Sequence, residues 1–188
     1  TPASVQLDFD GSTIRLEDGT LRIVGGFLDD VIEVELAPND PGDLDDQVVV
    51  TVNGRDPVSF AATKVERISV QGDGGDDTIT IDAALELRTF LSSGIGDDTI
   101  SGGSGADVIR GRTGNDSLSG GDGDDRIYGG RDSNTLDGGA GEDRLIGGRN
   151  EDSMLGGDGT DLIVGGRGDD SLEGEAGDDL LRGDKGDD

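Results

Sequence analysis

The segment GGDGDDRIY at residues 120–128 is one copy of a nine-residue unit that the chain repeats without insertion or deletion from Ser93 to its end. The next two copies read GGRDSNTLD at 129–137 and GGAGEDRLI at 138–146. The eighth position of each unit is always Ile, Leu or Met, and the sixth is Asp in every unit but one. A flexible linker has no reason to hold an aliphatic residue in phase, so this regularity predicts an ordered repeat structure.

The composition taken alone would instead suggest disorder. The 188 residues include 36 Gly and 43 Asp or Glu but only 15 Lys or Arg, which gives a formal net charge of -28. Cys and His are absent, which excludes disulfides, the usual zinc sites and Ser–His–Asp or Cys–His catalysis. We expect no nucleic-acid partner for so acidic a chain, and no apolar run is long enough to span a membrane.

A period of nine predicts a parallel β-roll in which two units form one coil of 18 residues. Residue i then lies over residue i+18, one strand spacing (about 4.8 Å) away. The first six positions form a turn, because Gly adopts positive φ at low cost, and the last three form a short strand. The eighth-position side chains point inward as a thin aliphatic core: Ile100, Ile109, Leu118, Ile127, Leu136, Leu145, Met154, Ile163, Leu172 and Leu181.

Stacking of coils brings the sixth-position carboxylates together in two rows, one along each edge of the roll. Two carboxylates about 4 Å apart repel by roughly 4 kcal/mol at an effective dielectric constant of 20, and a divalent cation between them reverses the sign. Ca²⁺ is the best candidate, because it takes roughly six to eight oxygen ligands and accepts the backbone carbonyls that Gly-rich turns expose. Mg²⁺ wants strict octahedral geometry, and transition metals would want His or Cys.

The two predicted rows differ in completeness. Row A is unbroken and contains Asp107, Asp125, Asp143, Asp161 and Asp179. Row B contains Asp98, Asp116, Asn134, Asp152, Asp170 and Asp188. The carbonyl ligands are expected from the Gly-rich turns, such as those of Gly102, Gly120, Gly138, Gly156 and Gly165.

Row B is interrupted at Asn134, which keeps a carbonyl oxygen but loses the charge. The fourth position, normally Gly, is Asp132 in that unit and Asn150 in the next unit on the same edge. Asn and Asp tolerate left-handed backbone, so these turns are expected to form. We predict that the two sites that include Asn134 are the weakest or empty.

The unit G-G-x-G-x-D-x-U-x of residues 93–188 resembles the repeat of the RTX (repeats-in-toxin) family, the hemolysin-type calcium-binding repeats of secreted bacterial proteins. The resemblance implies an all-β, right-handed parallel β-roll or β-helix solenoid with several bound Ca²⁺ ions. It also implies a bacterial protein that is secreted or on the cell surface. Such chains are exported unfolded, usually by a type I system, and fold on meeting external calcium.

The N-terminal half is poorer in glycine and reads as short β segments. Asn53 and Gly54 predict a hairpin turn near residues 48–60. Two segments echo the nonapeptide, GDGGDDTIT at 72–80 and, less well, GGFLDDVIE at 25–33. Their sixth-position residues, Asp77 and Asp30, would extend row B.

We therefore expect an irregular N-terminal part at residues 1–71, with residues 1–24 as a cap, and an RTX β-roll at residues 72–188 that is regular from residue 93. The edge opposite row B near residues 84–92 has no turn signature and is expected to carry no ion. A separate small β-sandwich at residues 1–65 is the alternative.

The function expected from these features is that of a non-catalytic calcium-binding module that folds after secretion. Residues 93–188 carry 24 acidic and nine basic residues, a net charge of -15, which about seven or more Ca²⁺ would roughly cancel. The chain begins at Thr1 without Met and ends within a repeat at Asp188, so we expect it to be part of a longer protein whose other domains are its partners.

A carbohydrate- or surface-binding module of adhesin type is the alternative function. Aligned aromatic or basic residues would support it, and no such ladder is apparent in the sequence. Arg at the third or seventh position is expected to offset the acidic surface charge: Arg126, Arg131, Arg144, Arg149 and Arg167.

Overall fold

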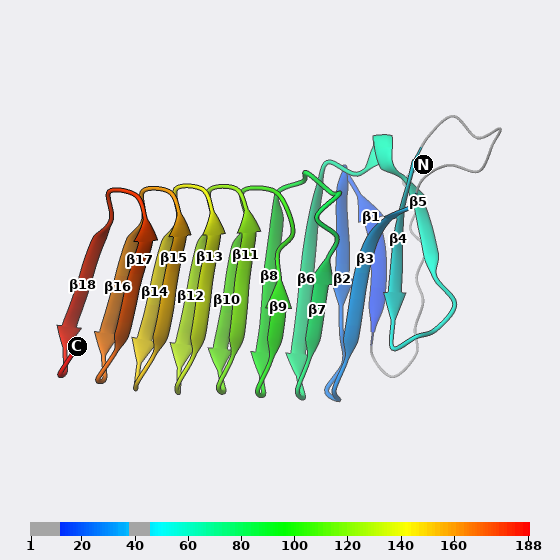
Figure 1. Cartoon of the computed structure of the whole chain (residues 1–188). Helices are drawn as coiled ribbons and strands as arrows, with labels where there is room; N and C mark the ends of the chain where they lie inside the picture. The colour runs from blue at the N-terminus through cyan, green and yellow to red at the C-terminus, as the bar shows by residue number, and fades with distance from the viewer. Residues whose placement is uncertain (1–11, 38–45) are drawn as a thin grey trace.

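The computed structural model describes residues 12–37 and 46–188. From β6 onward, successive strands alternate between two facing nine-stranded sheets, so the chain winds as a flattened solenoid (Figure 1). The predicted all-β solenoid of parallel stacked coils is confirmed. In the described residues the only helical element is a short 3₁₀ helix, η1 (Ala62–Lys64), and no helix there could span a membrane.

Each sheet takes one strand from every coil. Sheet 1 contains, in spatial order, β1 (Thr13–Glu17), β2 (Thr20–Val24), β6 (Arg67–Gly74), β8 (Thr89–Ile95), β10 (Val108–Thr113), β12 (Arg126–Arg131), β14 (Arg144–Arg149), β16 (Leu162–Arg167) and β18 (Leu180–Lys185). Sheet 2 contains β17 (Ser171–Ala176), β15 (Ser153–Asp158), β13 (Thr135–Ala140), β11 (Ser117–Asp122), β9 (Thr99–Ser101), β7 (Thr78–Ile81), β3 (Val31–Ala37), β4 (Gln47–Val52) and β5 (Val58–Ala61).

The regular coils have the predicted offset but longer strands. Ile109 pairs with Ile127 and Leu118 with Leu136, so residues 18 apart lie side by side in parallel register. The strands have six residues rather than three, because the first three positions of the next unit continue the ladder, as in the pairing of Gly121 with Gly139. The turn between sheets is therefore confined to the fourth to sixth positions.

The turns form at the positions that lack Gly as well. The fourth-position residues Asp132 and Asn150 have φ of 69° and 66°, which short polar side chains tolerate better than most. These two turns therefore form as the sequence predicts.

The N-terminal strands belong to the same two sheets as the regular coils. β2 pairs in parallel with β6, and β3 pairs in parallel with β7. This continuity contradicts the alternative of a separate β-sandwich at residues 1–65. Antiparallel strands finish this end: β1 lies on β2, and β4 and β5 form a hairpin on β3. Of the predicted cap at residues 1–24, residues 1–11 lie outside the described part.

The hairpin of β4 and β5 turns at Asn53 and Gly54, with φ of 55° and 62°. The N–H of Arg55 donates to the carbonyl of Val52 across this turn, at 3.1 Å. Positive φ at both central residues is the conformation that an Asn-Gly pair favours in hairpins.

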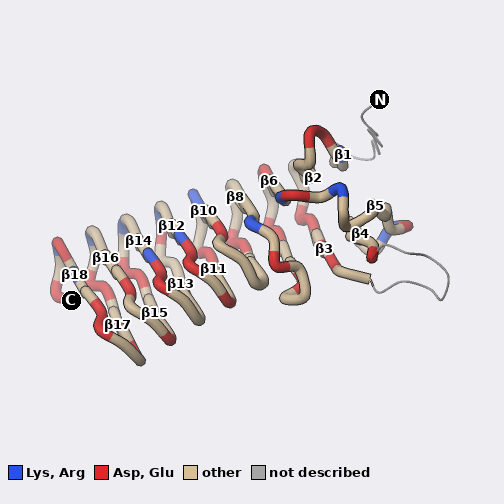
Figure 2. The backbone as a smooth tube through the Cα atoms, turned by 90° about the horizontal axis from the view of Figure 1, so that it is seen from above, with Lys and Arg blue, Asp and Glu red and all other residues tan. Residues whose placement is uncertain are grey.

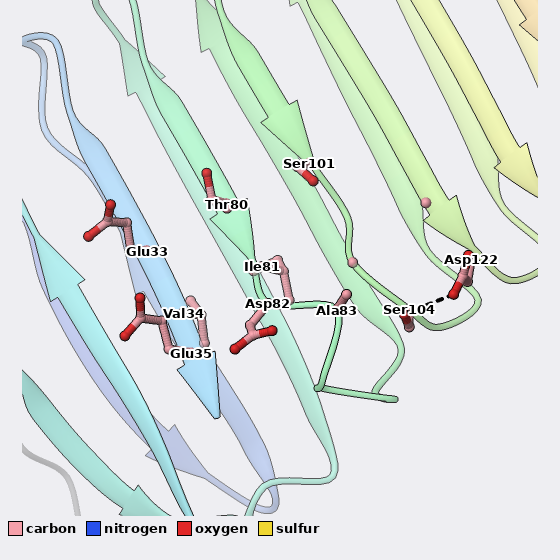
Figure 3. A pocket seen from close by; sticks show the side chains of 12 residues that line it. Glu33, Val34, Glu35, Thr80, Ile81, Asp82, Ala83, Ser101, Ser104 and Asp122 are labelled. Atoms are coloured by element: carbon pink, nitrogen blue, oxygen red, sulfur yellow. Dashed lines mark hydrogen bonds between the residues drawn. The ribbon is translucent and has the colours of Figure 1, made fainter. Parts of the chain in front are cut away.

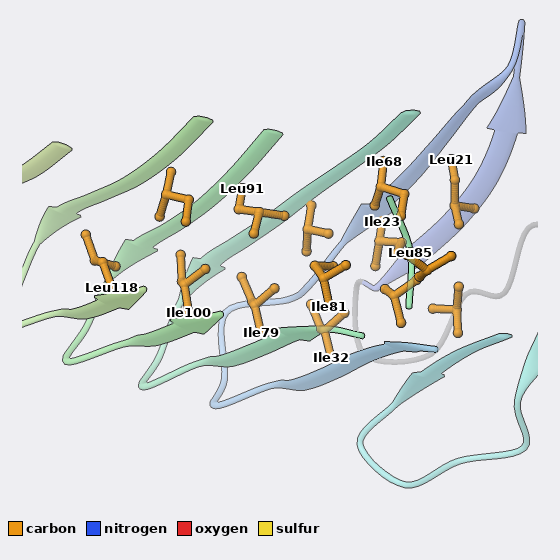
Figure 4. Close-up of a cluster of buried hydrophobic side chains, with 14 of the residues drawn as sticks. Leu21, Ile23, Ile32, Ile68, Ile79, Ile81, Leu85, Leu91, Ile100 and Leu118 are labelled. Carbon is orange, nitrogen blue, oxygen red and sulfur yellow. The ribbon is translucent and has the colours of Figure 1, made fainter. Parts of the chain in front are cut away.

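The core is one continuous column of aliphatic side chains between the sheets (Figure 4). Eighth-position side chains from Ile100 to Ile163 are at most 1% exposed. The N-terminal coils bury more, because their strands carry two inward aliphatic residues, as Ile79 and Ile81 do in β7. In the regular coils the second inward position is Gly, so their core is thinner.

The final coil departs from the predicted core. Leu181 is 41% exposed, and Leu172 is only partly buried. Both lie in the last strand of their sheet, where no further coil covers them.

Candidate metal-binding edges

The sixth-position carboxylates of row A lie buried at one edge and stack as predicted. The N–H of Asp107 donates to Oδ1 of Asp125 at 2.7 Å, and the N–H of Asp125 donates to Oδ1 of Asp143 at 2.8 Å. The same bond joins Asp143 to Asp161 and Asp161 to Asp179. Each carboxylate thus ties the preceding turn to its own, a role for Oδ1 that the sequence did not reveal.

Row B repeats this arrangement along the opposite edge. The N–H of each sixth-position residue donates to Oδ1 of the next one, at 2.7–3.1 Å, through Asp30, Asp77, Asp98, Asp116, Asn134, Asp152, Asp170 and Asp188. The irregular spacing before residue 93 leaves the row intact. Asp30 and Asp77 are 2% and 1% exposed, so the stacking expected of these two residues is observed.

The edge near residues 84–92, which is expected to carry no ion, has a threonine in place of a row A carboxylate. Thr89 occupies the place before Asp107 in row A, and its N–H donates to Oδ1 of Asp107 at 2.8 Å. The next coil toward the N-terminus places Ile68 beside Thr89. Row A therefore begins at Asp107, while row B runs back to Asp30.

The second carboxylate oxygen has no partner in most of these residues. Oδ2 is buried and makes no hydrogen bond in Asp77, Asp98, Asp107, Asp116, Asp125, Asp143, Asp152, Asp161 and Asp170. Leaving a buried polar group unpaired costs about 1–3 kcal/mol, and more for a charged one. The described structure thus holds a regular series of acceptor oxygens that need a cation or a proton.

A backbone carbonyl faces the same small space as each orphaned oxygen. A Cβ built on Gly120 would lie 2.1 Å from Oδ2 of Asp125 and 2.6 Å from the carbonyl oxygen of Gly138. The equivalent carboxylate and carbonyl oxygens of their own coils face Gly102 and Gly156. Glycine at the first position is therefore needed for the two oxygens to approach, and a set of carboxylate and carbonyl oxygens without a donor suits Ca²⁺.

The electrostatics of the rows favour neutralisation. Burial raises the pKa of Asp125 to about 8, against the lowering effect of the N–H of Asp107, and the charges of Asp107 and Asp143 raise it further. Burial likewise raises the pKa of Asp116 to about 7 and that of Asp143 to about 6. Asp125 would therefore largely hold a proton at neutral pH, and Asp116 would do so in part, unless a cation replaced it.

The repeat carries a family assignment. The model of the RTX calcium-binding nonapeptide repeat matches residues 92–126, 119–154 and 155–188, which together are more than half of the chain. The chain belongs to this RTX family. No curated protein and no solved structure matches it.

The RTX row B is modified at Asn134. Its Oδ1 accepts the N–H of Asp116 at 3.1 Å, as an aspartate would. Its Nδ2 stands where Oδ2 stands elsewhere and donates to the carbonyl of Asp132 at 3.1 Å and to Oδ1 of Asp152 at 3.0 Å. The amide therefore supplies hydrogen-bond donors at the place where the other RTX units present an unpaired acceptor.

The RTX rows contain no compact carboxylate cluster. Within the described ranges, no three acidic side chains converge on one point. A bound ion would therefore take a large share of its ligands from the backbone, as Ca²⁺ does in other proteins.

A separate hollow of about 480 Å³ lies on the outer face of sheet 2 (Figure 3). Glu33, Glu35, Asp82 and Asp122 contribute its carboxylates, and Ser104 donates to Asp122 at 3.4 Å. None of these residues belongs to either RTX row.

Proposed function

We propose that this chain is a non-catalytic calcium-binding module that folds on Ca²⁺ binding after secretion and stabilises a larger extracellular bacterial protein. The observation that carries the proposal is the series of buried, unpaired Oδ2 atoms on nine aspartates. Membership of the RTX family supports calcium as the ion.

The proposed ligands are successive sixth-position aspartates of one row, together with backbone carbonyls of the Gly-rich turns between them. In row A each interval from Asp107 to Asp179 would hold one ion. In row B the intervals from Asp30 to Asp116 and from Asp152 to Asp188 would do so. These are nine intervals, four in row A and five in row B, in keeping with the expected seven or more ions. Each ion would have mixed carboxylate and carbonyl coordination of the kind that Ca²⁺ accepts.

The structure gives a reason for folding to depend on the ion. From β10 to β16 each strand buries a single aliphatic side chain, while every turn between them except that of Asn134 buries one carboxylate. A net charge of -15 in residues 93–188 adds repulsion. Calcium removes both penalties, so its binding free energy becomes folding free energy.

The proposed setting follows from the affinity of such sites. Extracellular calcium modules bind with a Kd of about 10⁻⁴–10⁻³ M. Sites of this strength would be empty in a cytosol and filled outside the cell. The regular coils would therefore remain unfolded during export and fold afterwards.

Amide hydrogen exchange resolved along the chain tests this proposal, with circular dichroism as a global measure. In a chelator, we expect the amides of β10 to β18 to exchange rapidly, while those of β2, β3, β6 and β7 stay protected by their larger core. Added Ca²⁺ should protect the regular coils and increase the β signal, and Mg²⁺ at equal concentration should not. Protection of β10 to β18 that is already complete in chelator would contradict the proposal.

A further inference from the structure

The basic residues of the regular coils all lie on one sheet. The strands of sheet 1 from β10 to β18 carry Arg110, Arg112, Arg126, Arg131, Arg144, Arg149, Arg167, Arg182 and Lys185, which are all nine Lys and Arg of residues 93–188. The same strands carry a single acidic residue, Asp184. The strands of sheet 2 from β9 to β17 carry no basic residue and five acidic ones: Asp122, Asp137, Asp158, Glu173 and Glu175.

The parallel register arranges these cations in columns, as Figure 2 shows along β10 to β18. Arg149 pairs with Arg167, and Arg167 pairs with Lys185. Arg131 precedes them in line, because its neighbour Gly130 pairs with Gly148. These four residues, here called the basic ladder, repeat at one strand spacing of about 4.8 Å. The ladder was missed in the sequence because third positions are basic only in every second unit.

A second, shorter column lies at the other end of the same strands, where Arg126 pairs with Arg144. Between the two columns Tyr128, Ile146 and Val164 form a half-buried apolar strip in register. The outer face of sheet 1 therefore presents an apolar strip with cations on both sides.

The ladder residues are exposed and have no anionic partner within the described residues. Arg182 pairs with Asp184, Arg112 donates to Ser92 at 2.7 Å, and Arg110 lies 5.5 Å from the ring of Tyr128. The ladder makes no comparable contact. The sequence suggested that these arginines offset the acidic surface charge. Both sheets border the same two acidic rows, so charge compensation alone would not restrict the cations to sheet 1.

We propose that the outer face of sheet 1 from β10 to β18 binds an extended acidic polysaccharide. The polymer runs across the strands and places successive carboxylates on Arg131, Arg149, Arg167 and Lys185. A linear chain with one carboxylate on each sugar suits this face, because a sugar residue is about as long as one strand spacing. The apolar strip then lies under the sugar rings.

Nucleic acid fits this face less well. A single-stranded nucleic acid binds on several aromatic side chains that stack with its bases, and Tyr128 is the only aromatic residue of β10 to β18.

Binding of a short, soluble oligogalacturonate to the calcium-loaded full chain tests the proposal by calorimetry. The variant R131Q/R149Q/R167Q should bind at least ten-fold more weakly, with a shallower dependence on salt. The charge-matched control R22Q/K64Q/R67Q changes three exposed basic residues outside the ladder and should stay within about two-fold of the parent. The milder variant R126Q/R144Q gives a second measurement at the other column.

Several outcomes would overturn the proposal. These are equal loss in the ladder and control variants, unchanged binding in the ladder variant, or binding of neutral dextran or oligo-dT as tightly as oligogalacturonate. Salt-dependent self-association that the ladder variant abolishes, with no binding of oligogalacturonate, would instead make the face an interface between copies. Both triple variants must keep the calcium-dependent circular dichroism of the parent.

Discussion

Replacing Asn134 by Asp should make the middle coils more dependent on calcium. In the parent chain Nδ2 of Asn134 donates hydrogen bonds to the carbonyl of Asp132 and to Oδ1 of Asp152. In most other units the corresponding atom is a carboxylate Oδ2 without a hydrogen-bond partner. The N134D variant removes these donors and inserts a charge between Asp116 and Asp152. It also restores the carboxylate that two sites of row B lack.

The two effects have opposite signs and comparable sizes. Without calcium, each lost hydrogen bond costs about 1 kcal/mol, and a carboxylate pair about 4 Å apart repels by up to about 4 kcal/mol. The folded form of the middle coils without calcium should therefore be about 2–5 kcal/mol less stable in the variant than in the parent. With calcium at about 100 times Kd, each new site adds about 2.7 kcal/mol. Two new sites then make the variant at least as stable as the parent.

The calcium concentration at which the coils fold, followed by circular dichroism, measures the first effect, because the regular coils are expected to be unfolded in chelator. Urea unfolding at about 10 mM calcium measures the second effect for sites of the expected affinity. Calorimetric titration should show one or two additional ions in N134D. The reciprocal control D143N places an amide in row A, between Asp125 and Asp161, and should show one or two ions fewer. Equal ion counts in N134D and the parent, or a larger β signal of N134D than of the parent in chelator, would refute the reasoning.

Two further predictions follow from the rows. In G138A the new Cβ would lie 2.4 Å from both Oδ2 of Asp143 and the carbonyl of Gly156, so calcium stoichiometry should fall by at least one. G74A, whose Cβ meets only one atom at 3.8 Å, should bind as the parent does; equal losses would show that calcium does not use this space. The calcium-free fold should weaken with rising pH, because burial raises the pKa values of Asp107, Asp116 and Asp125 to about 6, 7 and 8. In the protonated form these three carboxyl groups stabilise the fold fully at a pH below about 4, which is the pKa in the unfolded chain. This stabilisation is lost as the pH rises through the higher pKa values of the folded chain. Circular dichroism of calcium-free protein between about pH 5 and 8.5 measures this, and a β signal that grows with pH would contradict it.

The strict period of the repeat made the regular coils predictable. Because the offset between coils is dictated by two units of nine, the pairing of Asp125 with Asp143 follows from counting alone. The weaker echo at residues 25–33 was enough to place Asp30 in row B. The strand length was wrong because glycines were treated only as turn residues, whereas Gly121 and Gly139 extend the parallel ladder.

Other features depend on three-dimensional neighbours that the period does not encode. The larger N-terminal core depends on strand pairings between distant parts of the sequence, such as that of β3 with β7. The stacked residues Asp30 and Asp77, which precede these strands, are 47 residues apart. The donor role of Asn134 could not be predicted, since it depends on the turn bringing the carbonyl of Asp132 close. The basic ladder becomes visible only when alternate units are assigned to different sheets.

The bonds between Oδ1 and the preceding coil also have a mechanical consequence. Each coil is held to its neighbour by two strands and two such carboxylates, and a force along the solenoid axis would load one coil at a time from the end. Each detached coil would release 18 residues, the offset that separates bonded aspartates, or about 60 Å of extended chain. With calcium on both edges, the module would lengthen in equal steps under tension and re-form coil by coil when the load is removed.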